Sequence, residues 1–205
     1  MRVLVAAFYT NDFYKKHAQR LVESIQRVGI QTYTIEQVHG CKTWSDAVCR
    51  KVSWIRETMD YLEDHDGLFY VDADAEFMRK PDWTVMKGCD FAAVEWKRHA
   101  NCDPEALTGS MFFRNNDRVR GFLDEWDKLT PKYRHTFTPE QRSLAEYFSN
   151  PNPIAFKKLP LGWCRIFDDM KAMVSDEETI IQHYQASREY KEIEAKEAAK
   201  AKRTV

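Results

Sequence analysis

Residues 68–77 read Leu68-Phe69-Tyr70-Val71-Asp72-Ala73-Asp74-Ala75-Glu76-Phe77, an apolar run that ends abruptly in two aspartates. Four apolar residues followed at once by alternating carboxylates predict a buried strand that delivers acids to the edge of a sheet. Side chains alternate along an extended chain, so Asp72 and Asp74 are expected to point to the same side. Two hard oxygen ligands there suit Mg²⁺ or Mn²⁺, although aspartates are also common in turns and helix caps.

The segments before this strand extend it into an α/β pattern. Residues 3–8 predict a first buried strand, and the helix that follows has Asn11 or Asp12 as its cap and Gly29 as its stop. Residues 31–38 predict a second strand, and a long amphipathic helix begins at Trp44. A β-α-β-α-β order implies a parallel sheet with right-handed crossovers.

The second half of the chain is less regular. Strands are predicted over residues 89–94, 106–114, 154–159 and 179–184, with helices over 119–129 and from Pro139 onward. Gly109 interrupts one of these strands, which indicates either a bulge or the close approach of a ligand or another backbone. Residues 1–187 are expected to form one domain, and the Lys-, Glu- and Ala-rich residues 188–205 a solvated helix or a frayed tail.

Composition narrows the class of protein. The chain has 205 residues, of which 43% are hydrophobic and 31% charged, as expected of a globular domain with its own core. A net charge of -1 predicts no strong attraction to nucleic acid or anionic membranes. The start of the chain has no cleavable leader pattern, and no apolar run approaches the roughly 20 residues that span a bilayer.

The cysteines are scattered and odd in number, without C-x-x-C spacing. A zinc site or a disulfide framework is therefore not expected. The pattern instead predicts reduced thiols in a cytoplasmic protein. The five positions are Cys41, Cys49, Cys89, Cys102 and Cys164.

Other residues could complete a site around the two aspartates. His183 follows a small apolar run and could be a third metal ligand, or a structural histidine. Ser187 and Arg188 lie close to it in sequence and could bind phosphate. Lys51 borders the apolar stripe of the long helix and could reach a phosphate, although a solvated lysine is more usual there. Glu140 lies near the start of a predicted helix. It could act as a general base, bind the acceptor through its carboxylate, or cap the helix.

Taken together, these features resemble the nucleotide-sugar-binding half of GT-A glycosyltransferases, over residues 2–188 and in the family's order. The family hallmark is a hydrophobic strand that ends in D-x-D, here Asp72-Ala73-Asp74. Leu107-Thr108-Gly109-Ser110-Met111 resembles the small-residue strand of the donor site, and Glu140-Gln141 the acidic-Gln helix start. His183-Tyr184-x-Ala186-Ser187-Arg188 resembles the C-terminal segment of glycogenin-like members. The chain departs from them at Ala186, where many have Gly, and at Glu189, where they have Lys.

The resemblance implies a single-domain, Rossmann-like α/β fold with a mixed, mainly parallel sheet flanked by helices. It also implies a metal-dependent transfer from a nucleotide-diphosphate sugar, a UDP-sugar on family frequency, with Mn²⁺ or Mg²⁺ bound. The short chain suggests a minimal catalytic domain. The acceptor is open among a glycan, a lipid, a protein and a modified nucleobase.

The resemblance also assigns site residues. Asp74 would bind the metal directly, Asp72 would contact the ribose or the metal through water, and His183 would be the third ligand. Asp72, Asp74 and Glu140 are the expected catalytic residues. The expected donor-binding residues are Ala7, Phe8, Tyr9, Thr10, Lys51, Asp72, Ala73, Gly109, Ser110, Ser187 and Arg188.

Two other functions fit parts of the pattern. A catalytically inactive GT-A-like protein could bind a nucleotide sugar without turnover. A nucleotidyltransferase would have a similar sheet and acidic metal site, but usually a Gly-rich basic loop after the first strand. Residues 9–13 of this chain contain neither glycine nor a cation, which disfavours that reading.

Overall fold

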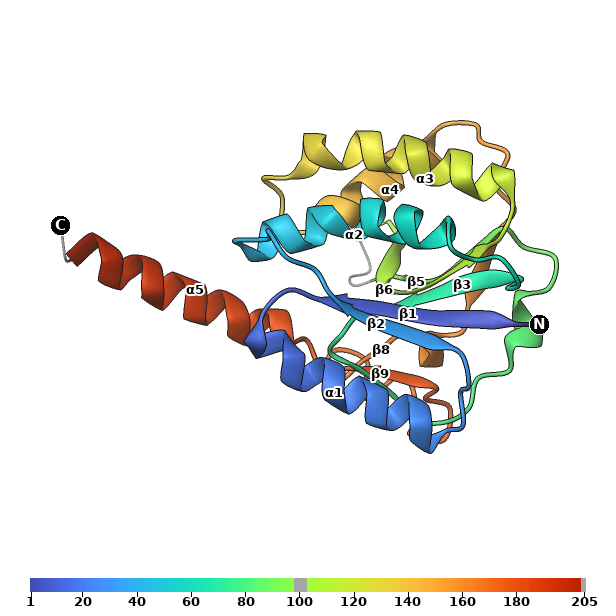
Figure 1. Ribbon diagram of the computed structural model, residues 1–205, viewed down its shortest axis with the longest axis horizontal. Coiled ribbons are helices and arrows are strands. Elements are labelled where there is room, and N and C mark those ends of the chain that lie inside the picture. The colour runs from blue at the N-terminus through green and yellow to red at the C-terminus, as the bar shows by residue number, and fades with distance from the viewer. Residues whose placement is uncertain (98–102, 204–205) are drawn as a thin grey trace.

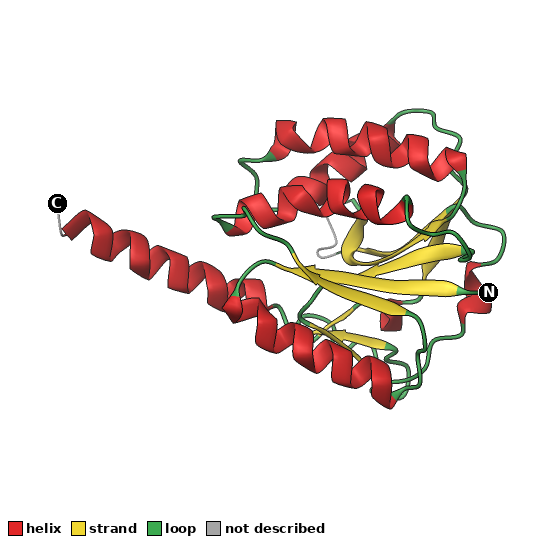
Figure 2. Ribbon diagram, viewed as in Figure 1, coloured by secondary structure: helices red, strands yellow, loops and turns green. Residues whose placement is uncertain are grey.

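The computed structural model describes residues 1–97 and 103–203, with side chains through Lys196, so Cys102 lies outside the described residues. A six-stranded sheet forms the centre, and helices cover both of its faces (Figures 1 and 2). Helices α2, α3 and α4 lie on one side of this sheet (Figure 1). Helix α1 lies on the other side, together with a small three-stranded sheet.

The central sheet has the strand order β2-β1-β3-β6-β5-β7, and the small sheet the order β4-β9-β8. The strands are β1 (Val3–Tyr9), β2 (Tyr33–Gln37), β3 (Gly67–Val71), β4 (Ala75–Phe77), β5 (Phe91–Trp96), β6 (Glu105–Arg114), β7 (Phe156–Leu159), β8 (Arg165–Ile166) and β9 (Ile181–His183). The helices are α1 (Asp12–Arg27), α2 (Trp44–Met59), α3 (Asp117–Leu129), α4 (Pro139–Ser149) and α5 (Ala186–Arg203). Short 3₁₀ helices are η1 (Trp83–Met86), η2 (Thr130–Tyr133) and η3 (Leu161–Trp163).

The first half of the chain confirms the β-α-β-α-β pattern. β1 pairs in parallel with both β2 and β3. The side chain of Asn11 caps α1 by accepting the Tyr14 N–H at 3.1 Å, and Gly29 follows the helix with a φ of 74°. Only a residue tolerant of positive φ can turn the chain there, which explains the glycine.

The second half adds β6, which pairs antiparallel with β3 and with β5, and β7, which pairs in parallel with β5. The sheet is therefore mixed and mainly parallel, as expected, and the strand ends shift slightly from the predicted ranges. No helix in the described part of the chain is long and apolar enough to cross a membrane.

The apolar run of β3 is continuous because both faces of this strand are buried. Leu68 and Tyr70 pack with α2 and α3 on one face, while Phe69 and Val71 pack on the other face toward the small sheet. All four side chains are at most 2% exposed. A central strand covered by layers on both sides needs apolar residues at every position, so the usual alternation with polar residues disappears.

Candidate functional site

A cavity of about 420 Å³ opens at the carboxyl ends of β1 and β3. Its walls come from the end of β1, the start of α2, the turn after β3, and β6. The start of α4, the small sheet and the start of α5 complete them. Ligand sites of open α/β sheets lie outside the carboxyl ends of their strands, so the position itself indicates a binding site.

Asp72 and Asp74 lie in the turn between β3 and β4. The Ala75 N–H donates to the Asp72 carbonyl across this turn at 3.0 Å. The chain turns here, so the expectation of an extended backbone through both aspartates is wrong. The expectation that the two carboxylates lie close enough to act together is confirmed, because their ligand atoms lie within 4.8 Å of each other.

His183 reaches the same turn from far along the sequence. β9 pairs antiparallel with β4, and the register places His183 opposite Ala75. One ligand atom from each of Asp72, Asp74 and His183 lies within 4.8 Å of the others. This Asp72–Asp74–His183 cluster lines the cavity.

Each carboxylate of the cluster is held through one of its two oxygens. Asp72 Oδ1 lies 2.9 Å from Lys51 Nζ and accepts the Tyr70 hydroxyl at 2.8 Å. Asp74 Oδ2 accepts the backbone N–H of Ala186 at 2.7 Å. Asp72 Oδ2 and Asp74 Oδ1 have no hydrogen-bond partner among the described residues, which leaves one oxygen of each for a ligand.

The charges of the cluster perturb one another. Burial and the adjacent Asp72 raise the pKa of Asp74. Burial also disfavours ionised Asp72, but Lys51 and His183 outweigh it and lower the pKa of Asp72. Burial alone would lower the pKa of His183, whereas the Cys164, Asp74 and Asp72 side chains raise it to about 9. A positive charge is thus favoured between these carboxylates.

Gly109 leaves the space that a metal ion would need. A Cβ built at this position would lie 2.9 Å from His183 Cε1, 3.1 Å from His183 Nδ1 and 3.3 Å from Asp72 Oδ2. A side chain would therefore fill the gap between two of the candidate ligands. Two carboxylates and an imidazole around such a gap fit a divalent cation that keeps other positions for substrate oxygens.

A second buried group of charges lies beside the cluster. Lys51 Nζ is 2.9 Å from Asp72 Oδ1 and 3.3 Å from Glu140 Oε1, and Lys51 is 5% exposed, so the solvated alternative for this lysine is wrong. Thr108 Oγ1 donates to Glu140 Oε1 at 2.9 Å. The other oxygen, Glu140 Oε2, is buried without a hydrogen-bond partner among the described residues. An unpaired buried acceptor that borders a cavity suits a hydroxyl donor from a ligand.

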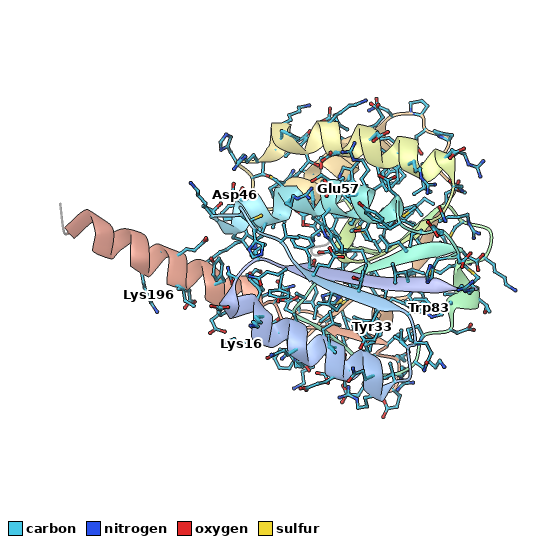
Figure 3. All side chains as sticks on the ribbon, in the orientation of Figure 1. Lys16, Tyr33, Asp46, Glu57, Trp83 and Lys196 are labelled. Atoms are coloured by element: carbon cyan, nitrogen blue, oxygen red, sulfur yellow. The ribbon has the colours of Figure 1, made fainter. Side chains whose placement is uncertain are left out.

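Helix α5 forms one rim of the cavity and then extends away from the body, where Lys196 lies (Figures 1 and 3). Arg188 pairs with Asp168 and with Asp169 Oδ2, the latter at 3.2 Å. Lys191 Nζ lies 3.4 Å from the centre of the Trp44 ring. The Glu194 carboxylate accepts the Trp44 N–H at 3.0 Å, at the first residue of α2. Residues within 188–205 therefore contact the site directly.

Most of the site residues expected from the sequence line this one cavity. They are Phe8, Tyr9, Thr10, Lys51, Asp72, Ala73, Asp74, Gly109, Glu140, His183, Ser187 and Arg188. Ala7 and Ser110 do not line it and are fully buried. The Ser110 hydroxyl instead lies 2.8 Å from His183 Nε2.

Sequence reasoning missed other residues that line the cavity, among them Tyr14, Cys164 and Lys191. Tyr14 stands in the first turn of the helix after β1, and that position at a strand's carboxyl end could have marked it. Burial, Asp74 and Asp72 raise the pKa of Tyr14, so its hydroxyl stays protonated. Cys164 and Lys191 carry no comparable local signal.

Chemically, this arrangement can bind a divalent cation and an anion next to each other. The Asp72–Asp74–His183 cluster faces a cavity whose rim carries Arg188 and Lys191. A metal bound by carboxylates and backed by cations suits a ligand with phosphate groups. The buried Glu140 oxygen adds an acceptor for a hydroxyl group.

No protein-family model and no curated protein matches this chain. Among solved structures, the chain is similar to a glycosyltransferase involved in the glycosylation of the major capsid of PBCV-1. The TM-score is 0.73 over 95% of this chain and 100% of that chain, at 12% sequence identity. Likeness at this identity concerns the fold alone. The chain therefore has the Rossmann-like fold of a glycosyltransferase.

Proposed function

We propose that this protein is a metal-dependent GT-A glycosyltransferase that moves a sugar from a nucleotide-diphosphate sugar to a hydroxyl acceptor. The observation that carries the proposal is the convergence of Asp72, Asp74 and His183 in one cavity. The fold shared with a glycosyltransferase supports the reaction class. The choice of a UDP-sugar as donor rests on the sequence resemblance.

The leaving group explains why such a site needs positive charge. Breaking the bond between the anomeric carbon and phosphate leaves a nucleoside diphosphate with added negative charge. Mn²⁺ or Mg²⁺, held by the Asp72–Asp74–His183 cluster, would neutralise that charge when bound. Asp72 Oδ2 and Asp74 Oδ1 are the carboxylate oxygens left for it.

The start of α5 is the proposed diphosphate contact. Ser187 and Arg188 line the cavity in the first turn of this helix. A helix start carries partial positive charge, which favours an anion there. Lys191 lies one turn further along and adds a second cation at the same rim. Arg188 is already held by Asp168 and Asp169, so it must share its guanidinium with them.

The end of β1 is the proposed base and ribose site. Phe8, Tyr9 and Thr10 line the cavity, and Ala7 supports them from within the sheet. Tyr14 adds an aromatic wall from the first turn of α1. An aromatic ring offers a stacking surface to a nucleobase.

In this proposal the transferred sugar lies beside Glu140. Its unpaired Oε2 would accept a hydroxyl from the donor sugar or from the acceptor. Lys51 and Thr108 hold the other oxygen, so the carboxylate has one fixed orientation. Glu140 is therefore the proposed carboxylate that accepts a hydrogen bond from a substrate hydroxyl, or that takes the proton of the acceptor hydroxyl as a general base.

Thermal stability in the presence of nucleotides tests the donor site. UDP, GDP, CDP, ADP and their common sugars are each added with and without Mn²⁺. A ligand that binds only the folded protein adds about 2.7 kcal/mol at 100 times its dissociation constant. One nucleotide is expected to stabilise the protein, and only with the metal present.

Two variants test whether metal-dependent binding and turnover depend on the proposed metal site rather than on carboxylates elsewhere on the surface. Asp74→Asn should lose the Mn²⁺-dependent shift and the hydrolysis of the nucleotide sugar while keeping its far-UV circular dichroism. Asp64→Asn, at an exposed loop carboxylate, should behave as the wild type. Retained activity in Asp74→Asn would contradict the assignment of Asp74 as a metal ligand. Metal-dependent nucleotide binding without turnover would instead indicate an inactive binding protein.

A further inference from the structure

An exposed aromatic ring lies at the edge of the cavity, just before helix α4. Phe137 lines the cavity and is 86% exposed. Single apolar side chains are common on protein surfaces, so exposure alone indicates nothing. Of the five large hydrophobic residues that are exposed in the described part of the chain, however, Phe137 is the one that lines the cavity. Its ring is therefore part of the wall of the site.

A second aromatic ring on this rim, Trp44, is already covered on one face. The Lys191 ammonium lies over the Trp44 ring, 3.4 Å from the ring centre. The same ammonium is 5.9 Å from the centre of the Phe137 ring, at the outer limit of a cation–π contact. Phe137 is therefore the ring with a face open to a ligand.

Three polar side chains beside this ring lack a hydrogen-bond partner among the described residues. Glu140 lines the cavity, and its Oε2 is buried and unpaired. The Thr138 hydroxyl does not cap α4, although Thr138 occupies the N-cap position. Thr138 and Gln141 line the same cavity. A buried acceptor is rarely left unpaired in a folded protein, so the Glu140 oxygen in particular indicates a hydrogen-bond donor on a ligand.

The chemistry of these groups describes the ligand that would satisfy them. A carboxylate oxygen accepts a hydrogen bond, while a hydroxyl and an amide can each donate and accept. The face of an aromatic ring carries partial negative charge and attracts C–H groups. A sugar has both features, because its hydroxyl groups surround a ring whose faces carry C–H groups.

Other classes of acceptor would satisfy fewer of these groups. A lipid chain needs a continuous apolar surface, whereas Thr138 and Gln141, which lie beside Phe137 on this rim, are polar. A serine side chain of a protein brings one hydroxyl, which could pair with Glu140 but not with the other two groups as well. A saccharide brings several hydroxyl groups at once.

We propose that the acceptor of this protein is a saccharide, whose ring stacks on Phe137 and whose hydroxyl groups bind the polar side chains beside it. The inference rests on the proposed glycosyltransferase function and names the class of its acceptor. The acceptor subsite consists of Phe137, Thr138, Glu140 and Gln141.

The subsite adjoins the metal cluster through a shared lysine. Lys51 Nζ lies 3.3 Å from Glu140 Oε1 and 2.9 Å from Asp72 Oδ1. A hydroxyl bound by Glu140 Oε2 is therefore close to the donor that the metal would hold. Transfer breaks the bond between the anomeric carbon and the diphosphate oxygen and joins that carbon to the acceptor oxygen. The hydroxyl proton leaves to Glu140 or to the departing diphosphate.

Saturation-transfer difference NMR of the full chain tests sugar binding without requiring turnover. The probes are the methyl glycosides of common monosaccharides, measured with and without UDP and Mn²⁺. At least one glycoside is expected to receive saturation, strongest at the C–H protons of one face of its ring. Phe137→Ala should lose this signal, and Phe137→Trp, which keeps an aromatic face, should retain it.

Another exposed aromatic residue provides the matched control. Tyr61 is 82% exposed and does not line the cavity, so Tyr61→Ala should give the wild-type signal. Equal saturation of the glycoside in Phe137→Ala and Tyr61→Ala would overturn the proposal.

Transfer kinetics test the same residues during turnover, with the nucleotide sugar that stabilises the protein as donor. Phe137→Ala should raise the KM for the glycoside about 10-fold and change kcat less, because stacking holds the ground state and the transition state alike. Gln141→Ala should raise the same KM. Transfer to a serine-containing peptide or to a long-chain alcohol, but to none of the glycosides, would overturn the proposal.

The outcomes also distinguish the acceptor subsite from the proposed function. Metal-dependent hydrolysis of a nucleotide sugar, without binding of any glycoside, leaves the function intact and overturns the saccharide subsite. Glycoside binding that depends on Phe137, without turnover of any nucleotide sugar, supports the subsite and contradicts the glycosyltransferase function.

Discussion

Replacing Lys51 by Met would remove the cation that lies between the buried Glu140 carboxylate and the half-buried Asp72 carboxylate. Lys51 Nζ lies 2.9 Å from Asp72 Oδ1 and 3.3 Å from Glu140 Oε1, and it donates to the Thr108 carbonyl at 3.3 Å. Methionine has a similar length and stays apolar, so packing along α2 is kept. The perturbation is therefore mainly electrostatic.

The cost follows from the charges left behind. Removing one partner of a buried ion pair destabilises a protein by about 3–5 kcal/mol, because the other charge stays buried and unpaired. Glu140 has 8% side-chain exposure, so water can offset little of this. For a domain of this size each kcal/mol lowers Tm by about 2–4 °C, so a fall of roughly 6–20 °C is expected.

Thermal and chemical unfolding of matched variants measure this cost. Lys87→Met, at an exposed lysine, should leave Tm close to the wild-type value. The double variant Lys51→Met/Glu140→Gln should recover part of the loss, because one of the unpaired carboxylates is then neutral. A Tm for Lys51→Met within about 2 °C of the wild type would refute the reasoning, since it would mean that the carboxylates need no buried cation.

Three further changes give separate readouts. Gly109→Ala should cost about 1–3 kcal/mol of stability and also weaken Mn²⁺ binding, because the new Cβ would lie 2.9 Å from Cε1 of the buried His183 ring and must displace it; unchanged binding by calorimetry would contradict this. Hydrogen bonds and a nearby guanidinium outweigh burial and lower the pKa of Asp90, so its stabilisation is present above the unfolded pKa near 3.8 and is lost as pH falls through the lower folded value. The free energy of unfolding of Asp90→Asn, measured between pH 2 and pH 6, should therefore fall less toward low pH than that of the wild type, because the contribution of Asp90 is missing. Truncation after Arg188 removes the Glu194 carboxylate from the start of α2, the Lys191 contact with the Trp44 ring, and the Tyr190 ring that packs on Phe13 and Tyr14. It should cost about 2–4 kcal/mol by denaturant unfolding, and a loss below about 0.5 kcal/mol would show that these contacts contribute nothing.

Local patterns in the sequence carried the prediction of the first half of the fold. The apolar run of β3 and the helix start at Asn11 are properties of neighbouring residues, so they can be recognised without a partner. The D-x-D segment was located correctly at the end of that strand. Its geometry was not, because a turn between β3 and β4, rather than an extended strand, brings the two carboxylates together.

The contacts that Lys51, Glu140 and Ser110 make in the folded protein could not be predicted from local patterns. Lys51 and Glu140 are 89 positions apart, and Ser110 and His183 are 73 positions apart. Each looks ordinary in its own segment, a helix lysine, a helix-start acid and a strand serine. Their roles depend on which strands pair and in what register.

The sequence by itself determined the alternation of strands and helices, the buried central strand and the acids at its end. These features follow from the spacing of apolar residues and from short-range capping, which act within a few positions along the chain. Only the tertiary structure decided that β4 and β9 bring His183 beside Asp74, and that Lys51 is buried between Asp72 and Glu140. The reason is physical: a buried charge or hydroxyl is tolerated only where a partner from another segment meets it, and that meeting is a property of the folded chain.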